Sequence, residues 1–269
     1  MAGQRSVAQP HAFQKDLIRP ASDGRNLTTM FQAIRDALLS VVFPHPCSVC
    51  GRGVEKYADG PACSKCWDET TIFTGDETLC AKCSQLLLLK PPLGEAFCHR
   101  CDGHFYDQAI SVGLYERALA ACVVALKSEP HIPARLRRLL AELFVRAPFY
   151  GADLIIPVPL SKARWIERGF NQAEVVAGVI ADAVGIPIQT RVLVRRSHTP
   201  MHRAAMDRRA RELTVENAFG VELPELVAGR SIILIDDVFT TGATVSGCAK
   251  VLKKTGADKV GVLTIARAR

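Results

Sequence analysis

Two adjacent carboxylates, Asp236 and Asp237, follow a run of apolar residues and precede a turn rich in hydroxyl groups. The turn consists of Thr240, Thr241, Gly242, Ala243 and Thr244. Carboxylates accept hydrogen bonds from sugar hydroxyls, and exposed N–H groups at the start of a helix bind phosphate. A ligand with both a diol and a phosphate, such as a ribose 5-phosphate, satisfies both halves of the pattern. An isolated Asp-Asp or Thr-Gly pair is common in ordinary capped turns, so the specificity lies in the combined string.

The residues on either side predict the elements that position these groups. Ile232 to Ile235 are four apolar residues, three of them β-branched, which is typical of a central parallel strand buried on both faces. A helix is expected from about Val245 to Lys254, with the hydroxyls as caps and Gly242 allowing a close backbone approach. Acids at the carboxyl end of such a strand lie at the edge where open α/β sheets bind their ligands.

The rest of the chain after about residue 107 alternates between strand and helix patterns. Strands are expected at 109–115, 153–158, 191–194, 231–236 and 259–266, and helices at 116–127, 133–144, 170–184 and 245–254. Gly185 and Gly256 stand where two of these helices should stop. The alternation favours parallel pairing with right-handed crossovers, so an α/β fold with a doubly wound parallel sheet is expected.

Eight of the ten cysteines form four CxxC pairs, separated by 12, 13 and 14 residues, which predicts a duplicated unit. The pairs are Cys47/Cys50, Cys63/Cys66, Cys80/Cys83 and Cys98/Cys101. Two such turns supply the four sulfurs of a closed tetrahedral Zn²⁺ site, so up to two structural zinc ions are expected. The simplest assignment joins the first pair to the second and the third to the fourth, and a crossed pairing of first with third is the alternative.

Other roles for the cysteines are less favoured. Redox CxxC chemistry and an iron–sulfur cluster do not need four evenly spaced pairs. Cys122 and Cys248 lie in helical patterns and are expected to be buried small hydrophobes.

The string from Ser231 to Thr244 resembles the thirteen-residue motif of type I phosphoribosyltransferases, which bind phosphoribosyl diphosphate with Mg²⁺. A second block, Pro157 to Leu160 followed by Glu167 to Ala173, resembles the PVPL…ERGFNQA signature of ComF/GntX-type proteins. Those proteins place an amino-terminal zinc ribbon before a phosphoribosyltransferase-like domain, and the four CxxC pairs complete the match. The resemblance covers most of the chain after about Val41.

The resemblance implies roles for the matched residues. Asp236 and Asp237 would contact the ribose hydroxyls in the catalytic site, and the turn from Thr240 to Thr244 would enclose the 5-phosphate. A diphosphate loop would contain Leu160, Ser161 and Lys162, with Arg164 and Arg168 as anion partners. A solvated helix face explains these basic residues about equally well. A turn glycine and a capping amide likewise explain Gly169 and Asn171.

Composition and resemblance together predict three parts: a disordered tail at 1–26, an amphipathic helix and double zinc ribbon at 27–106, and a phosphoribosyltransferase-like domain at 107–269. Between Arg191 and Arg211 there are seven arginines and one acid, Asp207, which indicates a mobile loop. The longest apolar run, Ala118 to Leu126, is about half of the roughly 18 residues that span a bilayer, and the first residues lack a signal-peptide core. A cytoplasmic protein without membrane insertion is expected.

Two classes of function agree with these patterns. The first is a Mg²⁺-dependent phosphoribosyltransferase, or a sensor of phosphoribosyl diphosphate or a related ribose phosphate; its acceptor is unidentified, and such folds can keep binding without catalysis. The second is a non-catalytic module for single-stranded DNA or nucleotides, working with DNA-uptake proteins. The zinc ribbons, the clustered arginines and a net charge of +7 favour it, as does the link of some ComF-type proteins to DNA uptake in natural competence. An aromatic content of 6% is low for a base-stacking platform.

Overall fold

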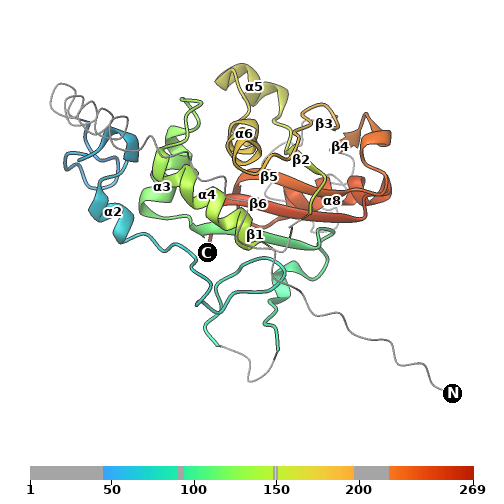
Figure 1. Ribbon diagram of the computed structural model, residues 1–269, viewed down its shortest axis with the longest axis horizontal. Helices are drawn as coiled ribbons and strands as arrows, with labels where there is room; N and C mark the ends of the chain where they lie inside the picture. The colour runs from blue at the N-terminus through green and yellow to red at the C-terminus, as the bar shows by residue number, and fades with distance from the viewer. Residues whose placement is uncertain (1–44, 90–93, 148, 150, 197–217) are drawn as a thin grey trace, which may run out of the picture.

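The computed structural model describes residues 45–89, 94–147, 149, 151–196 and 218–269 (Figure 1). Its centre is a four-stranded parallel sheet in the order β1-β6-β5-β2. The strands are β1 Gln108–Leu114, β2 Leu154–Pro157, β5 Ser231–Phe239 and β6 Lys259–Arg267. β6 has a neighbour on each side and is buried along all of its length except its first residue.

Helices cover both faces of this sheet, because successive side chains of a strand point to opposite sides. One face carries α3 Arg117–Ala125, α4 Ala134–Arg146 and α6 Gln172–Val184, and the other carries α8 Ala243–Lys254. In β5, Ile233 and Ile235 join the core under the first three helices, whereas Ile232 and Leu234 join the core under α8. The expected doubly wound α/β sheet is therefore confirmed.

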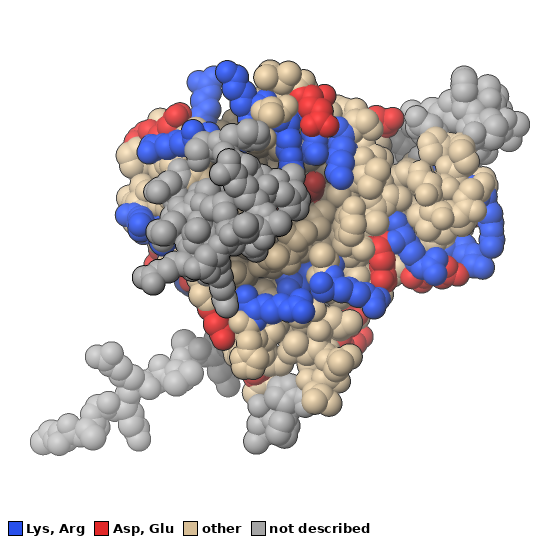
Figure 2. All heavy atoms as spheres, turned by 180° about the vertical axis from the view of Figure 1, so that it is seen from behind, with Lys and Arg blue, Asp and Glu red and all other residues tan. Residues whose placement is uncertain are grey.

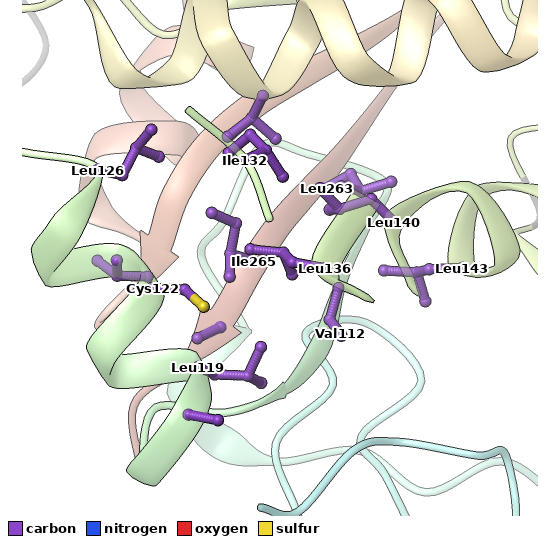
Figure 3. Close-up of a cluster of buried hydrophobic side chains, with 14 of the residues drawn as sticks. Val112, Leu119, Cys122, Leu126, Ile132, Leu136, Leu140, Leu143, Leu263 and Ile265 are labelled. Atoms are coloured by element: carbon purple, nitrogen blue, oxygen red, sulfur yellow. The ribbon is translucent and has the colours of Figure 1, made fainter. Parts of the chain in front are cut away.

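Figure 3 shows part of the first of these cores. Leu263 and Ile265 of β6 lie among Leu136 and Leu140 of α4, and Cys122 of α3 packs with them. The expectation that Cys122 is a buried small hydrophobe is confirmed. The same holds for Cys248, the other cysteine outside the CxxC pairs, which is buried in the core under α8.

Four elements differ from the sequence prediction: two short strands, the end of β5 and one short helix. The strand expected at 191–194 is β3 Leu193–Arg195, and it pairs antiparallel with β4 Phe219–Val221 in a separate two-stranded sheet. Its assignment to the parallel pattern was wrong, because a long-range partner rather than the local sequence decides the pairing of so short a strand. β5 continues beyond the expected end to Phe239, since β6 stays paired with it that far. A short helix that the periodicity does not predict, α5 Lys162–Arg168, follows β2.

The cysteine-rich part forms two small units at different places around the sheet (Figure 1). The first contains helix α2 Ser64–Asp68 and lies beside α3, whereas the second lies below β1. Cysteines of the first unit belong to the core with α3 and α4, and cysteines of the second belong to the core with α8. Short 3-10 helices occur at Tyr57–Asp59, His99–Cys101 and Pro224–Leu226.

Some expectations fall outside the residues that the structure describes. These are the tail at 1–26, the amphipathic helix at 27–42 and the part of the arginine-rich loop from 197 onward. Within the described ranges, no helix combines the length and the apolar content that a membrane crossing requires.

Candidate functional site

The two carboxylates lie on β5 beyond the point where the neighbouring strand β2 has ended. Pro157, the last residue of β2, pairs with Ile235, and the N–H of Val158 donates to the carbonyl of Ile235 at 2.8 Å. Asp236 and Asp237 follow directly, with β6 still paired on their other side. Among the described strands, none pairs with this side of β5 beyond Ile235, at the carboxyl ends of the strands where open α/β sheets bind ligands.

Both carboxylates are half-buried and are oriented by the backbone that follows them. Oδ1 of Asp236 accepts a hydrogen bond from the N–H of Asp237 at 2.9 Å, and Oδ1 of Asp237 accepts one from the N–H of Val238 at 2.7 Å. Burial first and the Asp237 charge second raise the pKa of Asp236 to about 8, and the Arg164 guanidinium opposes that rise. Burial and the neighbouring charge therefore favour the protonated form of Asp236, and a bound cation would favour the ionised form.

The turn after β5 is shaped by Gly242, which stands at the start of α8. Gly242 has a φ of 81°, a left-handed conformation that favours glycine, and a Cβ there would lie 2.5 Å from Cζ of Phe239. The other residues of the predicted phosphate turn are all exposed: Thr240, Thr241, Ala243 and Thr244. Oγ1 of Thr241 accepts a hydrogen bond from the N–H of Ala243 at 3.4 Å. Hydroxyls and the first N–H groups of α8 thus meet at one exposed surface, as a phosphate site requires.

The predicted diphosphate loop leaves β2 and enters α5. Ser161 is buried and caps α5, since its Oγ accepts a hydrogen bond from the N–H of Arg164 at 3.4 Å. Arg164 is close enough to Asp236 to affect the pKa of that carboxyl. Lys162 is exposed, and Nη1 of Arg168 donates to Oε1 of Gln172 on α6 at 2.7 Å. Leu160 is partly buried in the loop itself.

Gly169 and Asn171 have the structural roles that the sequence allowed. Gly169 ends α5 with a φ of 77°. Asn171 is buried and caps α6, with its Oδ1 accepting from the N–H of Ala173 at 3.1 Å. Its Nδ2 also donates to the carbonyl of Val158 at 3.0 Å, which ties α6 to the loop after β2.

Arg195, at the end of β3, is a further cation near the acid pair. Its guanidinium lies 5.3 Å from the centroid of the Phe219 ring, and Asp236 and Arg164 are near enough to affect its pKa. Burial lowers the pKa of Arg195, and Nε of this side chain has no hydrogen-bond partner among the described residues. The sequence placed seven arginines in this region and distinguished none of them; the available signal was the position of Arg195 directly after the apolar run Val192 to Val194.

The eight paired cysteines gather in two clusters in chain order. The clusters are Cys47, Cys50, Cys63 and Cys66, and Cys80, Cys83, Cys98 and Cys101, each with its four sulfurs within 4.8 Å of one another. The simplest pairing is therefore confirmed, and the crossed alternative is wrong. Several sulfur pairs are 3.4 to 3.7 Å apart, close to the edge of about 3.8 Å expected for four sulfurs at about 2.3 Å from zinc. The donor set and its geometry fit structural Zn²⁺.

Each of the two clusters contains the same kind of internal hydrogen bond, as the predicted duplication requires. The N–H of Cys63 donates to Sγ of Cys47 at 3.3 Å, and the N–H of Cys98 donates to Sγ of Cys80 at 3.2 Å. Against the effect of burial, backbone N–H donors lower the pKa of Cys47 to about 6 and the pKa of Cys80 to about 7. Thiols that lose their proton near neutral pH supply the thiolate that zinc binds.

Two family models match the chain, a double zinc ribbon domain over residues 38–102 and a phosphoribosyl transferase domain over residues 171–269. DNA utilization protein YhgH of Salmonella typhi is 33% identical over 230 residues, which cover 82% of this chain and 89% of that protein. The chain belongs to the YhgH family. The family resemblance inferred from the PVPL, ERGFNQA and DDVFTTGAT strings is therefore confirmed.

Two further proteins resemble the chain. Competence protein F of Haemophilus influenzae is 28% identical over 232 residues, covering 82% of this chain and 90% of its own. Among solved structures, the allosteric regulatory enzyme of purine biosynthesis superposes on 53% of this chain and 30% of its own, with 21% identity and a TM-score of 0.35.

One group of contacts in this YhgH-family chain lies outside all of the sequence motifs. The segment His104–Asp107, between the second cysteine cluster and β1, lies against the predicted phosphate turn and α8. Its contacts join positions as far apart as Phe105 and Ser246, which is why no local pattern indicates them.

Proposed function

We propose that this protein binds phosphoribosyl diphosphate, or a related ribose phosphate, with Mg²⁺ in the crevice bordered by Asp236, Asp237 and the turn from Thr240 to Thr244. The observation that carries the proposal is an acid pair and a left-handed turn at one open edge of the sheet, beside a strand that has already ended. The acids would accept hydrogen bonds from the ribose hydroxyls. The turn and the start of α8 would bind the 5-phosphate.

The acid pair also suits Mg²⁺, which prefers carboxylate and phosphate oxygens and usually keeps several waters. Asp236 and Asp237 offer two adjacent carboxylates, and the elevated pKa of Asp236 makes its ionisation responsive to a cation. When bound, Mg²⁺ would neutralise charge on the diphosphate. Arg164, Lys162 and Arg195 are the side chains of this chain that would hold the same diphosphate from the opposite side.

Transfer of the phosphoribosyl group is a second and separable part of the proposal. The bond between C1 of the ribose and the diphosphate oxygen would break, with both electrons leaving on the diphosphate, and an acceptor nucleophile would bond to C1. Positive charge would develop on the sugar and negative charge on the leaving group. The arginines around the crevice would stabilise the departing diphosphate, which is electrostatic catalysis. Release of inorganic diphosphate during a screen of nucleobase and amine acceptors would measure this step.

Calorimetric titration with phosphoribosyl diphosphate, with and without Mg²⁺, tests the binding proposal. Charge-assisted hydrogen bonds contribute about 1.5–3 kcal/mol each, so Asp236→Asn/Asp237→Asn should weaken binding at least about a hundredfold. The matched control is Asp153→Asn/Asp258→Asn, which removes two carboxylates at the opposite edge of the same sheet, before β2 and β6. Equal affinities of the two double variants would reject the site.

A second candidate function is binding of single-stranded DNA, in line with the DNA utilization and competence named for the relatives. Trp165 and Ile166 are 56% and 69% exposed on α5, on the same helix as Lys162, Arg164 and Arg168. Figure 2 shows Lys and Arg side chains gathered at the top of the molecule, the end that carries α5 in Figure 1. An exposed ring among cations is what sequence-tolerant binding of single strands uses. Binding of oligothymidylate that weakens steeply with salt would support this function, and no binding at low salt would reject it.

A further inference from the structure

We propose that the second cysteine cluster, Cys80/Cys83/Cys98/Cys101, positions the phosphate turn, whereas the first cluster does not. The inference rests on the proposed function of that turn. The segment His104–Asp107 follows Cys101 in the chain and packs against the turn before the chain enters β1. The two zinc sites would then be alike in chemistry and different in purpose.

His104 contacts the turn directly. A Cβ on Gly242 would lie 2.8 Å from Cε1 and 3.1 Å from Nδ1 of the His104 ring, so ring and turn are tightly packed. Nδ1 of His104 is 2.7 Å from Oη of Tyr106, and Nζ of Lys82 donates to the carbonyl of His104 at 2.8 Å. Lys82 lies between Cys80 and Cys83. Lys82, between two cysteines of the second cluster, thus holds the backbone of the residue whose ring touches the turn, and Tyr106 holds the ring itself.

Phe239, the residue before the turn, is held from the same side. Its ring meets the buried ring of Tyr106 edge-on, with centroids 5.9 Å apart. The guanidinium of Arg267 lies 4.5 Å from the centroid of the Phe239 ring, and Nη2 of Arg267 donates to Oε1 of Gln85 at 2.7 Å. Gln85 follows Cys83 by two positions. A zinc tetrathiolate carries a net double negative charge, which the buried Arg267 cation would offset.

The segment His104–Asp107 also holds α8, whose start would bind the phosphate. The N–H of Phe105 donates to Oγ of Ser246 at 3.2 Å, and Nζ of Lys250 lies 4.6 Å from the centroid of the Phe105 ring. Lys253 forms an ion pair with Asp107 at 2.8 Å. These contacts fall along one face of α8, so movement of the segment would move the helix start as well.

The first cluster serves as an internal comparison. Its unit is anchored to α3, where the N–H of Ala118 donates to Oγ1 of Thr70 at 3.1 Å, and to α4, where Arg135 pairs with Asp68 at 3.0 Å. Both helices lie on the opposite face of the sheet from α8. Loss of zinc there should therefore leave the turn in place.

Two matched variants test the inference, Cys98→Ser and Cys50→Ser, each replacing the most exposed cysteine of its cluster. Each should lose one zinc, as metal analysis would verify. In Cys98→Ser, amide hydrogen exchange over residues 239–250 should speed up and the Kd for phosphoribosyl diphosphate should rise, each about tenfold or more, since small misplacements of a binding group are costly. In Cys50→Ser neither quantity should change. Equal behaviour of the two variants would overturn the inference.

A third variant, His104→Ala, tests the contact without disturbing the metal. It should keep both zinc ions and still show faster exchange over residues 239–250 and weaker binding, and wild-type values for both would overturn the inference. It also decides the question if Cys98→Ser does not fold. Should the wild-type protein not bind phosphoribosyl diphosphate, the proposed function fails, and the exchange comparison still tests the positioning role on its own.

Discussion

Replacing Asp236 with Asn should stabilise the ligand-free protein at alkaline pH and leave its stability unchanged in acid. Burial and the neighbouring Asp237 charge raise the pKa of Asp236 from 3.8 to about 8. Between these values the folded protein holds a proton that the unfolded chain has released, so the free energy of unfolding falls as pH rises. Above about pH 8 the fall is complete. Asn has no proton to lose, so the variant does not undergo this loss.

The size of the effect follows from the same two pKa values. Each pKa interval of one corresponds to about 1.4 kcal/mol, so the range from 3.8 to about 8 gives an upper limit of about 6 kcal/mol. That is a large share of a typical total stability of about 5 to 15 kcal/mol. In the wild-type protein the N–H of Asp237 donates to Oδ1 of Asp236 at 2.9 Å. The amide oxygen of Asn can accept the same hydrogen bond, so the substitution removes the charge and keeps this contact.

Urea unfolding of wild type and Asp236→Asn at about pH 4 and about pH 9 measures the difference. The midpoints should coincide in acid, and the variant should have the higher midpoint in base. Asp237→Asn is the control. It removes the neighbouring charge but not the burial that raises the pKa of Asp236, so its gain in stability at alkaline pH should be smaller. A gain of the same size at both pH values, or a variant that is less stable in base, would refute the reasoning.

Three further predictions concern ligand, metal and nucleic acid. Because a bound cation favours the ionised form of Asp236, binding of Mg²⁺ and phosphoribosyl diphosphate near neutral pH should release about one proton; a binding heat independent of the buffer's ionisation enthalpy would contradict this. Freshly purified protein should contain two zinc ions per chain, and Cys63→Ser should lose one and destabilise the amino-terminal third; protein without zinc would refute the ribbon assignment. Trp165→Ala should weaken single-strand binding by about 1–3 kcal/mol, with the exposed Val124→Ala as control; equal losses would exclude stacking.

Features fixed by residues close together in the sequence were the ones that could be predicted. The CxxC pairs indicated metal clusters, because each pair makes a turn that aims two thiolates at one ion. The apolar run before Asp236 indicated a central strand, and the glycine and hydroxyls after it indicated the turn that starts α8. In each case the residues that identify the feature lie in one short stretch of the sequence, the longest being Cys80 to Cys101.

Features that depend on distant partners could not be predicted in the same way. β3 is three residues long, and its antiparallel partner β4 lies beyond a segment of more than twenty residues. Arg195 becomes relevant only because β3 brings it near Asp236, and His104 only because the turn around Gly242 packs against it. None of these relations leaves a periodic or spaced pattern in the sequence.

The arrangement behind the turn also links zinc to the ligand. The turn after β5 lies beyond the last residue of β2, so among the described strands of the parallel sheet β6 is the one paired with β5 there, and the short segment from His104 to Asp107 packs against the turn and α8. If zinc at the second cluster fixes that segment and so raises affinity for phosphoribosyl diphosphate, linkage requires the ligand to tighten that zinc by the same factor. With ligand present, a higher chelator concentration should be needed to remove one of the two zinc ions. Cys50→Ser keeps only the zinc ion of the second cluster, and the ligand should protect that ion. Protection of both ions, or of neither, would separate the metal from the turn.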